Sequence, residues 1–152
     1  METITAETTQ TVLYNLHILR NLIINYYPLF AQLPSFLNLI SHSVFPYMVL
    51  LLFHQQVTIA VFCECMTIFI TIAKKLPHLF KKELELFFEK VVFHYLGNIC
   101  VFHQRDRYLQ ERMLLQSLLE ILNDPLALES LYRNYDCDVY SLNVVGILFS
   151  IV

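Results

Sequence analysis

The chain has 152 residues, of which 57% are hydrophobic, with only 2 glycines and 5 prolines. Ordinary soluble domains are about 45–50% apolar, so this composition excludes a disordered chain, collagen and a many-turned β-sandwich. Lys and Arg number 10 against 13 Asp and Glu, which gives a net charge of −3. Because no segment concentrates positive charge, a nucleic-acid-binding surface is not expected.

Helical periodicity begins after a short N-terminal segment. Residues 1–7 are acidic and rich in Thr, lack the basic region of an export signal, and are expected to be disordered. From Thr8 to Tyr27, apolar residues recur at steps of three and four, which predicts a first helix that is interrupted by Pro28. The stripe consists of Val12, Leu16, Leu19, Ile23 and Tyr26.

Two strongly apolar helices are predicted next. The first runs from Ser35, a possible N-cap, to Phe53, with a break or new start at Pro46. The second covers Val57 to Lys75 and is apolar on nearly all sides, which is typical of a helix buried in a helical stack. The alternative is a small integral membrane protein with a span within residues 44–73, but Glu64 and the polar residues 54–56 interrupt that stretch.

The second half of the chain predicts shorter, more amphipathic helices. Pro77 to Leu96 forms one, with Pro77 in its first turn, a stop at Gly97, and Lys81 one turn from Glu85. Its apolar face comprises Phe80, Leu84, Phe87, Phe88, Val91 and Tyr95.

A fifth helix is predicted from Arg105 to Asn123, and a sixth from an Asp124 N-cap to about Tyr132. A last helix is expected to begin at Val139. The inward side chains of the fifth helix are expected to be Tyr108, Leu115, Leu118, Leu119 and Leu122.

These helices and their short connections predict an all-α fold, a right-handed α-solenoid of HEAT-like or armadillo-like helices. Residues 1–152 are expected to form a single helical domain. The apolar end at residues 149–152 suggests a fragment of a longer chain.

The usual catalytic motifs are missing from the sequence. It contains no glycine-rich phosphate loop, HExxH or GxSxG. Cys63 and Cys65 are about 200° apart around a helix and cannot chelate one metal ion together, and Cys100 with His103 supplies only two ligands. We therefore expect reduced thiols in a cytosolic protein, no metal ion and no cofactor. Glu64 is either a functional carboxylate or, as we favour, the partner of a polar group on a neighbouring helix.

A polar cluster separates the last two predicted helices. Asn134, Asp136 and Asp138 fall within five residues, although a helix cap needs only one such group. Asp136 or Asp138 is expected to cap the last helix, and Asn134 to take the left-handed position that ends the preceding one.

The segment Asn134-Tyr135-Asp136-Cys137-Asp138, with Asn143 after it, resembles the HUS box of the large guanine-nucleotide exchange factors for Arf GTPases, the BIG/GBF class. Weaker similarity covers residues 36–40, 76–88 and 113–123. The sequence departs from the family at residues 143–146, where Asn-Val-Val-Gly replaces the usual Asn-Leu-Phe-Glu.

The resemblance implies a non-catalytic regulatory and scaffolding region, because nothing in the chain matches the catalytic Sec-seven domain. In that family the region packs against the neighbouring DCB region of the same or a second chain and supports dimerisation and recruitment to the Golgi or trans-Golgi. Small GTPases of the Arf or Rab type are possible further partners. We expect the protein to be cytoplasmic and only peripherally associated with membranes.

Overall fold

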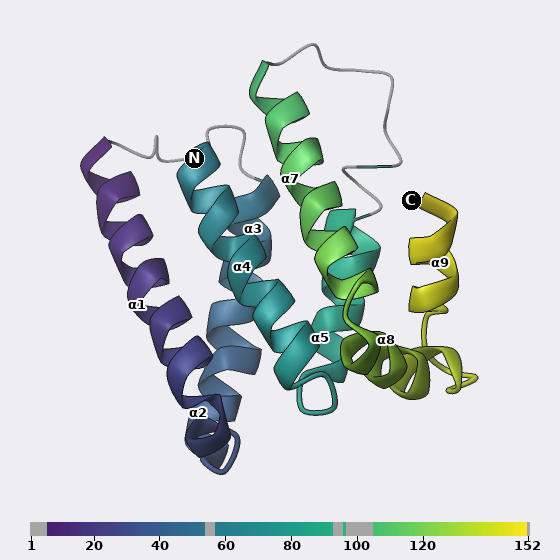
Figure 1. Cartoon of the computed structure of the whole chain (residues 1–152). Helices are drawn as coiled ribbons and strands as arrows, with labels where there is room; N and C mark the ends of the chain where they lie inside the picture. Colours follow the sequence, from purple (N-terminus) through teal and green to yellow (C-terminus); the bar gives the residue numbers. More distant parts are fainter. Residues whose placement is uncertain (1–5, 54–56, 93–95, 97–104, 152) are drawn as a thin grey trace.

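The computed structural model describes residues 6–53, 57–92, 96 and 105–151. Over these residues the chain is helical and contains no strand, which confirms the all-α prediction. Helix α4 (Ile59–Lys75) packs against α1 (Ala6–Phe30) and α7 (Arg105–Leu122), and the three lie side by side in Figure 1.

The first helix begins and ends outside its predicted bounds. It starts at Ala6, within the segment expected to be disordered, and continues past Pro28 to Phe30. The predicted interruption at Pro28 is therefore present, but it does not end the helix. The proline instead causes a kink at Tyr26, whose φ of −126° and ψ of 16° are not helical, because Pro28 lacks an N–H and crowds the preceding turn.

The second predicted helix is continuous from α2 (Pro34–Leu39) through the π-helical segment η1 (Ile40–Val44) to α3 (Phe45–Phe53). A break or a new start was predicted at Pro46; the helix does not break there, but the α-helical segment α3 starts beside it, at Phe45. The N–H of Phe45 bonds to the carbonyl of Ile40, so the wider π turn lies where Pro46 has no N–H to donate. The stacked rings of Phe30 and Phe36, 4.1 Å apart, join this helix to α1.

Helix α4 forms the centre of the core, as its apolar sequence predicts. Thr58 is its N-cap and accepts the N–H of Val61. Phe69 stacks on Phe87 with ring centroids 4.2 Å apart and meets Phe45 edge-on at 4.9 Å. The buried residues of α4 are Val61, Phe62, Cys65, Met66, Ile68, Phe69, Ile70, Ile72 and Ala73.

Within the described residues, one helix is long and apolar enough to cross a membrane, Pro34–Phe53. Core helices of soluble proteins also meet these two criteria, and a third of its most apolar window is buried in the fold. The predicted alternative span, residues 44–73, instead falls across two separate helices, α3 and α4.

The fourth predicted helix begins four residues later than expected. Leu76 to Phe80 forms a turn, closed by the N–H of Leu79 on the carbonyl of Leu76, so Pro77 does not lie in a first helical turn. Helix α5 (Lys81–Leu86) follows and continues as the π-helical segment η2 (Phe87–Val92). The predicted apolar face is buried where the structure describes it, whereas Tyr95 and the predicted stop at Gly97 lie outside the described residues.

The C-terminal part consists of α8 (Pro125–Leu131), the π-helical segment η3 (Tyr132–Asp136) and α9 (Val144–Ile151). Asp124 caps α8 by accepting the N–H groups of Leu126 and Ala127, each at 3.2 Å, as predicted. The last helix does not begin at Val139, however. Val139 and Tyr140 are 94% and 97% exposed in the turn before α9.

Candidate interaction site

The residues of the HUS-box resemblance lie where η3 meets the turn that leads to α9. We call residues 134–138 the box segment. Tyr135 is its anchor: its side chain is fully buried, and its hydroxyl donates to the carbonyl oxygen of Lys81 in α5 at 2.9 Å. Burial, and then the negative charges of Glu85 and Glu83, raises the pKa of the Tyr135 hydroxyl, which keeps it a neutral donor.

Asp136 caps the start of α9, although the N–H groups that it binds lie 9 and 10 residues further along the chain. Its carboxylate accepts the N–H of Val145 at 2.9 Å and that of Gly146 at 3.0 Å. These are N–H groups of the first helical turn, which have no partner within the helix. A carboxylate at this end also interacts favourably with the helix dipole.

Asp138 ties the turn to α5. It forms an ion pair with the ammonium group of Lys81 and accepts the N–H of Tyr140 at 3.0 Å and the hydroxyl of Ser141 at 3.2 Å. The hydrogen bond from Lys81, followed by that from the Tyr140 N–H, holds the pKa of Asp138 below its usual value. A backbone bond from the N–H of Ser141 to the carbonyl of Asp138, at 3.0 Å, closes the same turn.

The other predicted site residues make local contacts. The amide of Asn134 donates to the carbonyl of Ser130 at 2.8 Å. No non-glycine residue in the described part of the chain has a positive φ, so the expectation that Asn134 takes a left-handed position was wrong. The Cys137 side chain is exposed, and the carbonyl of Asn143 accepts the N–H of Ile147 at 3.0 Å.

Two residues that complete this corner were not predicted as part of it. Lys81 supplies both a carbonyl and an ammonium group, and Glu85 accepts the N–H of Leu142 at 2.7 Å. The sequence shows only that they are one helical turn apart, whereas in the structure Lys81 pairs with Asp138 and Glu85 accepts the N–H of Leu142. We call Lys81, Glu85, Tyr135, Asp136 and Asp138 the box frame.

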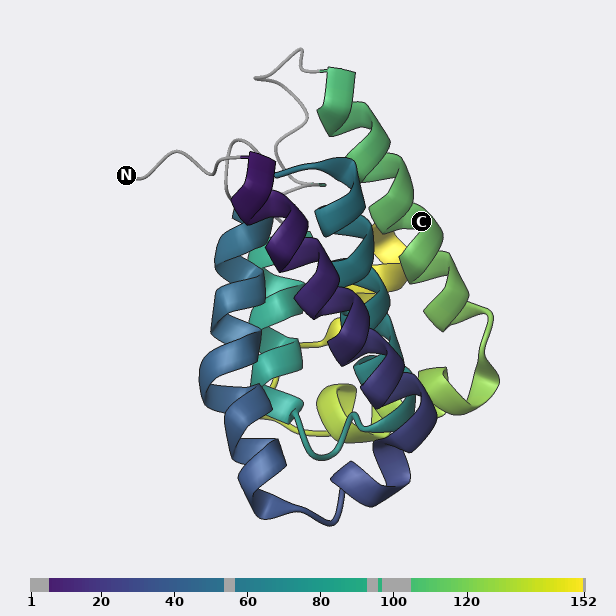
Figure 2. The ribbon, with the colours of Figure 1, turned by 90° about the vertical axis from the view of Figure 1, so that its left-hand side faces the viewer.

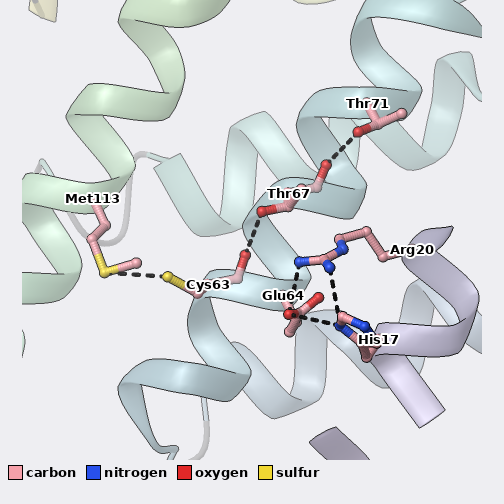
Figure 3. Close-up of polar contacts among 7 residues, drawn as sticks. All are labelled: His17, Arg20, Cys63, Glu64, Thr67, Thr71 and Met113. Carbon is pink, nitrogen blue, oxygen red and sulfur yellow. Dashed lines mark hydrogen bonds and ion pairs between the residues drawn. The ribbon is translucent and has the colours of Figure 1, made fainter. Parts of the chain in front are cut away.

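A second polar cluster joins α1 to α4 (Figure 3). Glu64 accepts a hydrogen bond from Arg20 at 2.9 Å, and Nδ1 of His17 lies 3.5 Å from the same oxygen. The Glu64 side chain is 14% exposed, and its other oxygen is buried with no hydrogen-bond partner. Glu64 thus bonds to a polar group on a neighbouring helix, which confirms the prediction.

The thiols near this cluster are not activated. Burial, and to a lesser extent Glu64, raises the pKa of Cys65 to about 12 and also raises that of Cys63. Cys63 donates to the sulfur of Met113 at 3.8 Å beside a groove of about 470 Å³ between α4 and α7. Over the described ranges, no three His, Cys, Asp or Glu side chains gather in a way that could hold a metal ion.

Charged side chains are almost absent from residues 8–53. Arg20 is the only Asp, Glu, Lys or Arg between Thr8 and Phe53, and it is turned to Glu64. We call the exposed side chains of residues 8–53 the uncharged surface, and Figure 2 views the molecule from the side of α1. Its large exposed apolar side chains are Tyr14, Ile18, Leu22, Ile24, Tyr26, Leu29, Leu33, Leu39, Tyr47, Leu50 and Phe53.

Comparisons with known proteins agree with the resemblance. A family model described as Mon2/Sec7/BIG1-like, HUS domain, matches residues 2–144. Brefeldin A-inhibited guanine nucleotide-exchange protein 4 of Arabidopsis thaliana is 33% identical over 78 residues, which are 51% of this chain and 4% of that protein. The chain thus matches a small part of a much longer relative, and no solved structure matches it. Since the family model covers almost the whole chain, the chain belongs to the Mon2/Sec7/BIG1-like HUS domain family.

Proposed function

We propose that this chain is a non-catalytic regulatory module of a large Arf guanine-nucleotide exchange factor. It packs against the DCB region of the same or a second chain, supports dimerisation, and contributes to recruitment to the cytoplasmic face of Golgi or trans-Golgi membranes. Arf-type or Rab-type GTPases are further candidate partners. The HUS family assignment supports the regulatory part of this proposal, and the uncharged surface supports the docking of another protein region.

The uncharged surface carries the proposal because a water-facing surface of this kind is unusual. Leu50 is 69% exposed, and Leu29 and Leu39 are 57% and 54% exposed, with no charged group among them. Large contiguous apolar patches on soluble proteins mark interaction sites, and the centre of a stable protein interface is depleted of charge. A permanent helical neighbour such as the DCB region fits this chemistry.

A lipid bilayer is the competing partner, as a surface or as the solvent of a spanning helix Pro34–Phe53. Helices that lie in the membrane interface usually carry Lys and Arg on their polar face, which attract anionic lipids. Residues 34–53 carry none, and their inner face, including Phe45 and Met48, is buried in the fold. These observations favour a protein partner.

We propose that the module forms one segment of an α-solenoid, an architecture in which each layer of helices covers the apolar face of the next. In this arrangement the box frame keeps α5, η3 and α9 in one geometry, so that the surfaces of the module stay complementary to its neighbours. The contacts from Tyr135 and Asp138 to Lys81, and from Asp136 to α9, support that role.

A single substitution tests the docking surface. In Leu50→Glu, a carboxylate replaces an exposed apolar side chain, so the free fold is little affected while docking must bury a charge. We expect titration with a DCB fragment from a large exchange factor of this family to show at least about a tenfold loss of affinity, equivalent to about 1.4 kcal/mol.

Leu126→Glu is the matched control, since Leu126 is 78% exposed but lies on α8, outside the uncharged surface. It should bind the DCB fragment like the unmodified chain. Equal affinities for Leu50→Glu and the unmodified chain, or partition of the unmodified chain into detergent micelles in place of DCB binding, would contradict the proposal.

A further inference from the structure

The one charged group between Thr8 and Phe53 belongs to a three-membered cluster at the edge of the uncharged surface (Figure 3). Nδ1 of His17 lies 3.0 Å from a guanidinium nitrogen of Arg20 and 3.5 Å from the Glu64 oxygen that Arg20 also binds. The His17 side chain is 50% exposed, whereas those of Arg20 and Glu64 are 25% and 14% exposed. A partner that docks on α1 therefore changes the surroundings of His17 most.

The cluster accommodates two protonation states of the imidazole. An Arg nitrogen can only donate, so the 3.0 Å contact from Arg20 fits an Nδ1 of His17 that carries no proton, whereas the 3.5 Å contact with Glu64 becomes an ion pair when His17 is protonated. With His17 neutral, Arg20 and Glu64 balance each other and the cluster has no net charge. With His17 protonated, two cations share one carboxylate, the Arg20 bond to Nδ1 is lost, and the cluster carries one positive charge.

The charged groups in contact with His17 are Arg20 and Glu64. Arg20 is the charged neighbour on α1, and Glu64 is the one on α4, where Cys63 points away toward Met113 (Figure 3). The adjacent helix Pro34–Phe53 contributes no Asp, Glu, Lys or Arg, and its His42 bonds to the carbonyl of Asn38.

We propose that His17 makes the docking of the DCB region sensitive to pH. This inference rests on the proposed docking of that region onto the uncharged surface. The partner face is a mainly apolar surface of the DCB region, because residues 8–53 offer it no charge beyond the paired Arg20. Charges of other elements contact the uncharged surface at Tyr27, under Lys75, and at Ser41, which donates to Glu83. Docking covers His17, and covering an uncompensated cation is costly. The docked state accordingly requires neutral His17, and acid favours dissociation.

The sign of the effect follows from linkage. A group that must lose its proton to bind weakens binding as the solution becomes more acidic. If the docked state excludes protonated His17, the affinity for the DCB region falls as the pH is lowered.

The test is a binding titration of a labelled DCB fragment onto the 152-residue chain at about pH 7.5 and about pH 5.5, with three variants. His17→Gln keeps an acceptor for Arg20 and leaves the Arg20–Glu64 pair in place, but it does not titrate, so its affinity should change much less with pH than that of the unmodified chain. His78→Gln replaces an exposed histidine in the turn between α4 and α5 and should keep the full pH dependence. His42→Gln should keep it as well.

Tighter binding at the lower pH would mean that the partner brings a carboxylate to His17, and it would overturn the inference. An undiminished pH dependence in His17→Gln, its loss in His42→Gln, or a pH-independent affinity of the unmodified chain would overturn it too, while the proposed function would stand. No binding at either pH would overturn both.

Discussion

At the scale of single residues, Asp136 has the most clearly defined structural contact of the box segment. Its two bonds to the N–H groups of Val145 and Gly146 cap α9. Replacing Asp136 with Ala leaves these groups without a protein acceptor and should lower the free energy of unfolding by about 0.5–2 kcal/mol, as for a lost N-cap. Urea denaturation of the variant measures this.

Cys137→Ser is a suitable control for Asp136→Ala. Cys137 is the exposed neighbour of Asp136, and an exposed substitution of this kind should change stability by less than about 0.5 kcal/mol. An unchanged unfolding transition for Asp136→Ala, combined with weaker binding of the DCB fragment, would show that the carboxylate acts at the interface and not as a cap.

Asp138 should make the stability of the fold depend on acid. Its pKa is lowered chiefly by the hydrogen bond from Lys81. A carboxyl group with a lowered pKa in the folded state stabilises the fold above its ordinary pKa, and this stabilisation disappears as the pH falls through the lowered value. Thermal melts between about pH 5 and about pH 2 should show a smaller decrease for Asp138→Asn than for the unmodified chain. Parallel pH curves for the two proteins would contradict this assignment.

The box segment could be recognised from the sequence, but the residues to which its side chains bond could not be predicted. Lys81 and Glu85 are separated by 57 residues from Asp138 and Leu142, the residues to which their side chains bond. The pattern of one helix cannot indicate which distant turn its charged side chains reach. Asp124 was predictable as a cap because its acceptor role is local.

At the scale of elements, α9 offers a test of helix propensity. Gly146 lies in its first turn, and a Cβ atom added there would meet Nδ2 of Asn143 at 3.0 Å. That side chain is flexible, so it can move aside at small cost. We expect Gly146→Ala to raise the free energy of unfolding by about 0.5–1 kcal/mol, since Gly is a poor helix former.

The same change in an Asn143→Ala background should give the whole of this gain, because the close neighbour is absent. Denaturant unfolding of the four proteins of this double-mutant cycle measures the coupling between the two positions. A decrease in stability in both backgrounds would show that the start of α9 cannot accept a side chain at residue 146.

Helix positions were predictable from the sequence more accurately than helix ends. The fifth helix, predicted as Arg105–Asn123, is observed as Arg105–Leu122, because its pattern is long and periodic. Its inward face was partly wrong: Leu114, Leu118 and Ile121 are buried, while Tyr108 is 68% exposed. Leucines at many positions around this helix make several stripes equally apolar, and only the packing against α4 selects one.

The prolines also show that the local sequence does not determine where a helix ends. Pro28 and Pro46 lie inside helices that absorb them through a kink and a π-helical segment, and Pro77 lies in a turn ahead of its helix. Local preference predicts that a proline disturbs a helix, but tertiary packing decides whether the helix bends or ends. Such packing, here against α4, is not visible in the local sequence.

At the scale of the whole molecule, charge is divided unequally along the chain. Residues 8–53 carry one charged side chain, whereas the segment from Lys81 to Lys90 alone carries several of each sign. Periodicity could predict the all-α class and which helices are strongly apolar. It could not show that α1 and Pro34–Phe53 leave large apolar side chains in water, because one apolar stripe gives no sign of whether a neighbour covers it.

This division of charge predicts how DCB docking responds to salt. Screening weakens interactions between charged surfaces, since the Debye length falls from about 10 Å at 0.1 M to about 3 Å at 1 M ionic strength. Arg20, the one charge of the uncharged surface, is already paired with Glu64, so there is little long-range attraction to screen. Titrations of the DCB fragment at about 0.1 M and about 1 M NaCl should therefore give affinities within about twofold of each other. Binding to the charged segment around Lys81 to Lys90 would instead weaken about tenfold or more with salt, and that result, together with full binding by Leu50→Glu, would move the docking site away from the uncharged surface.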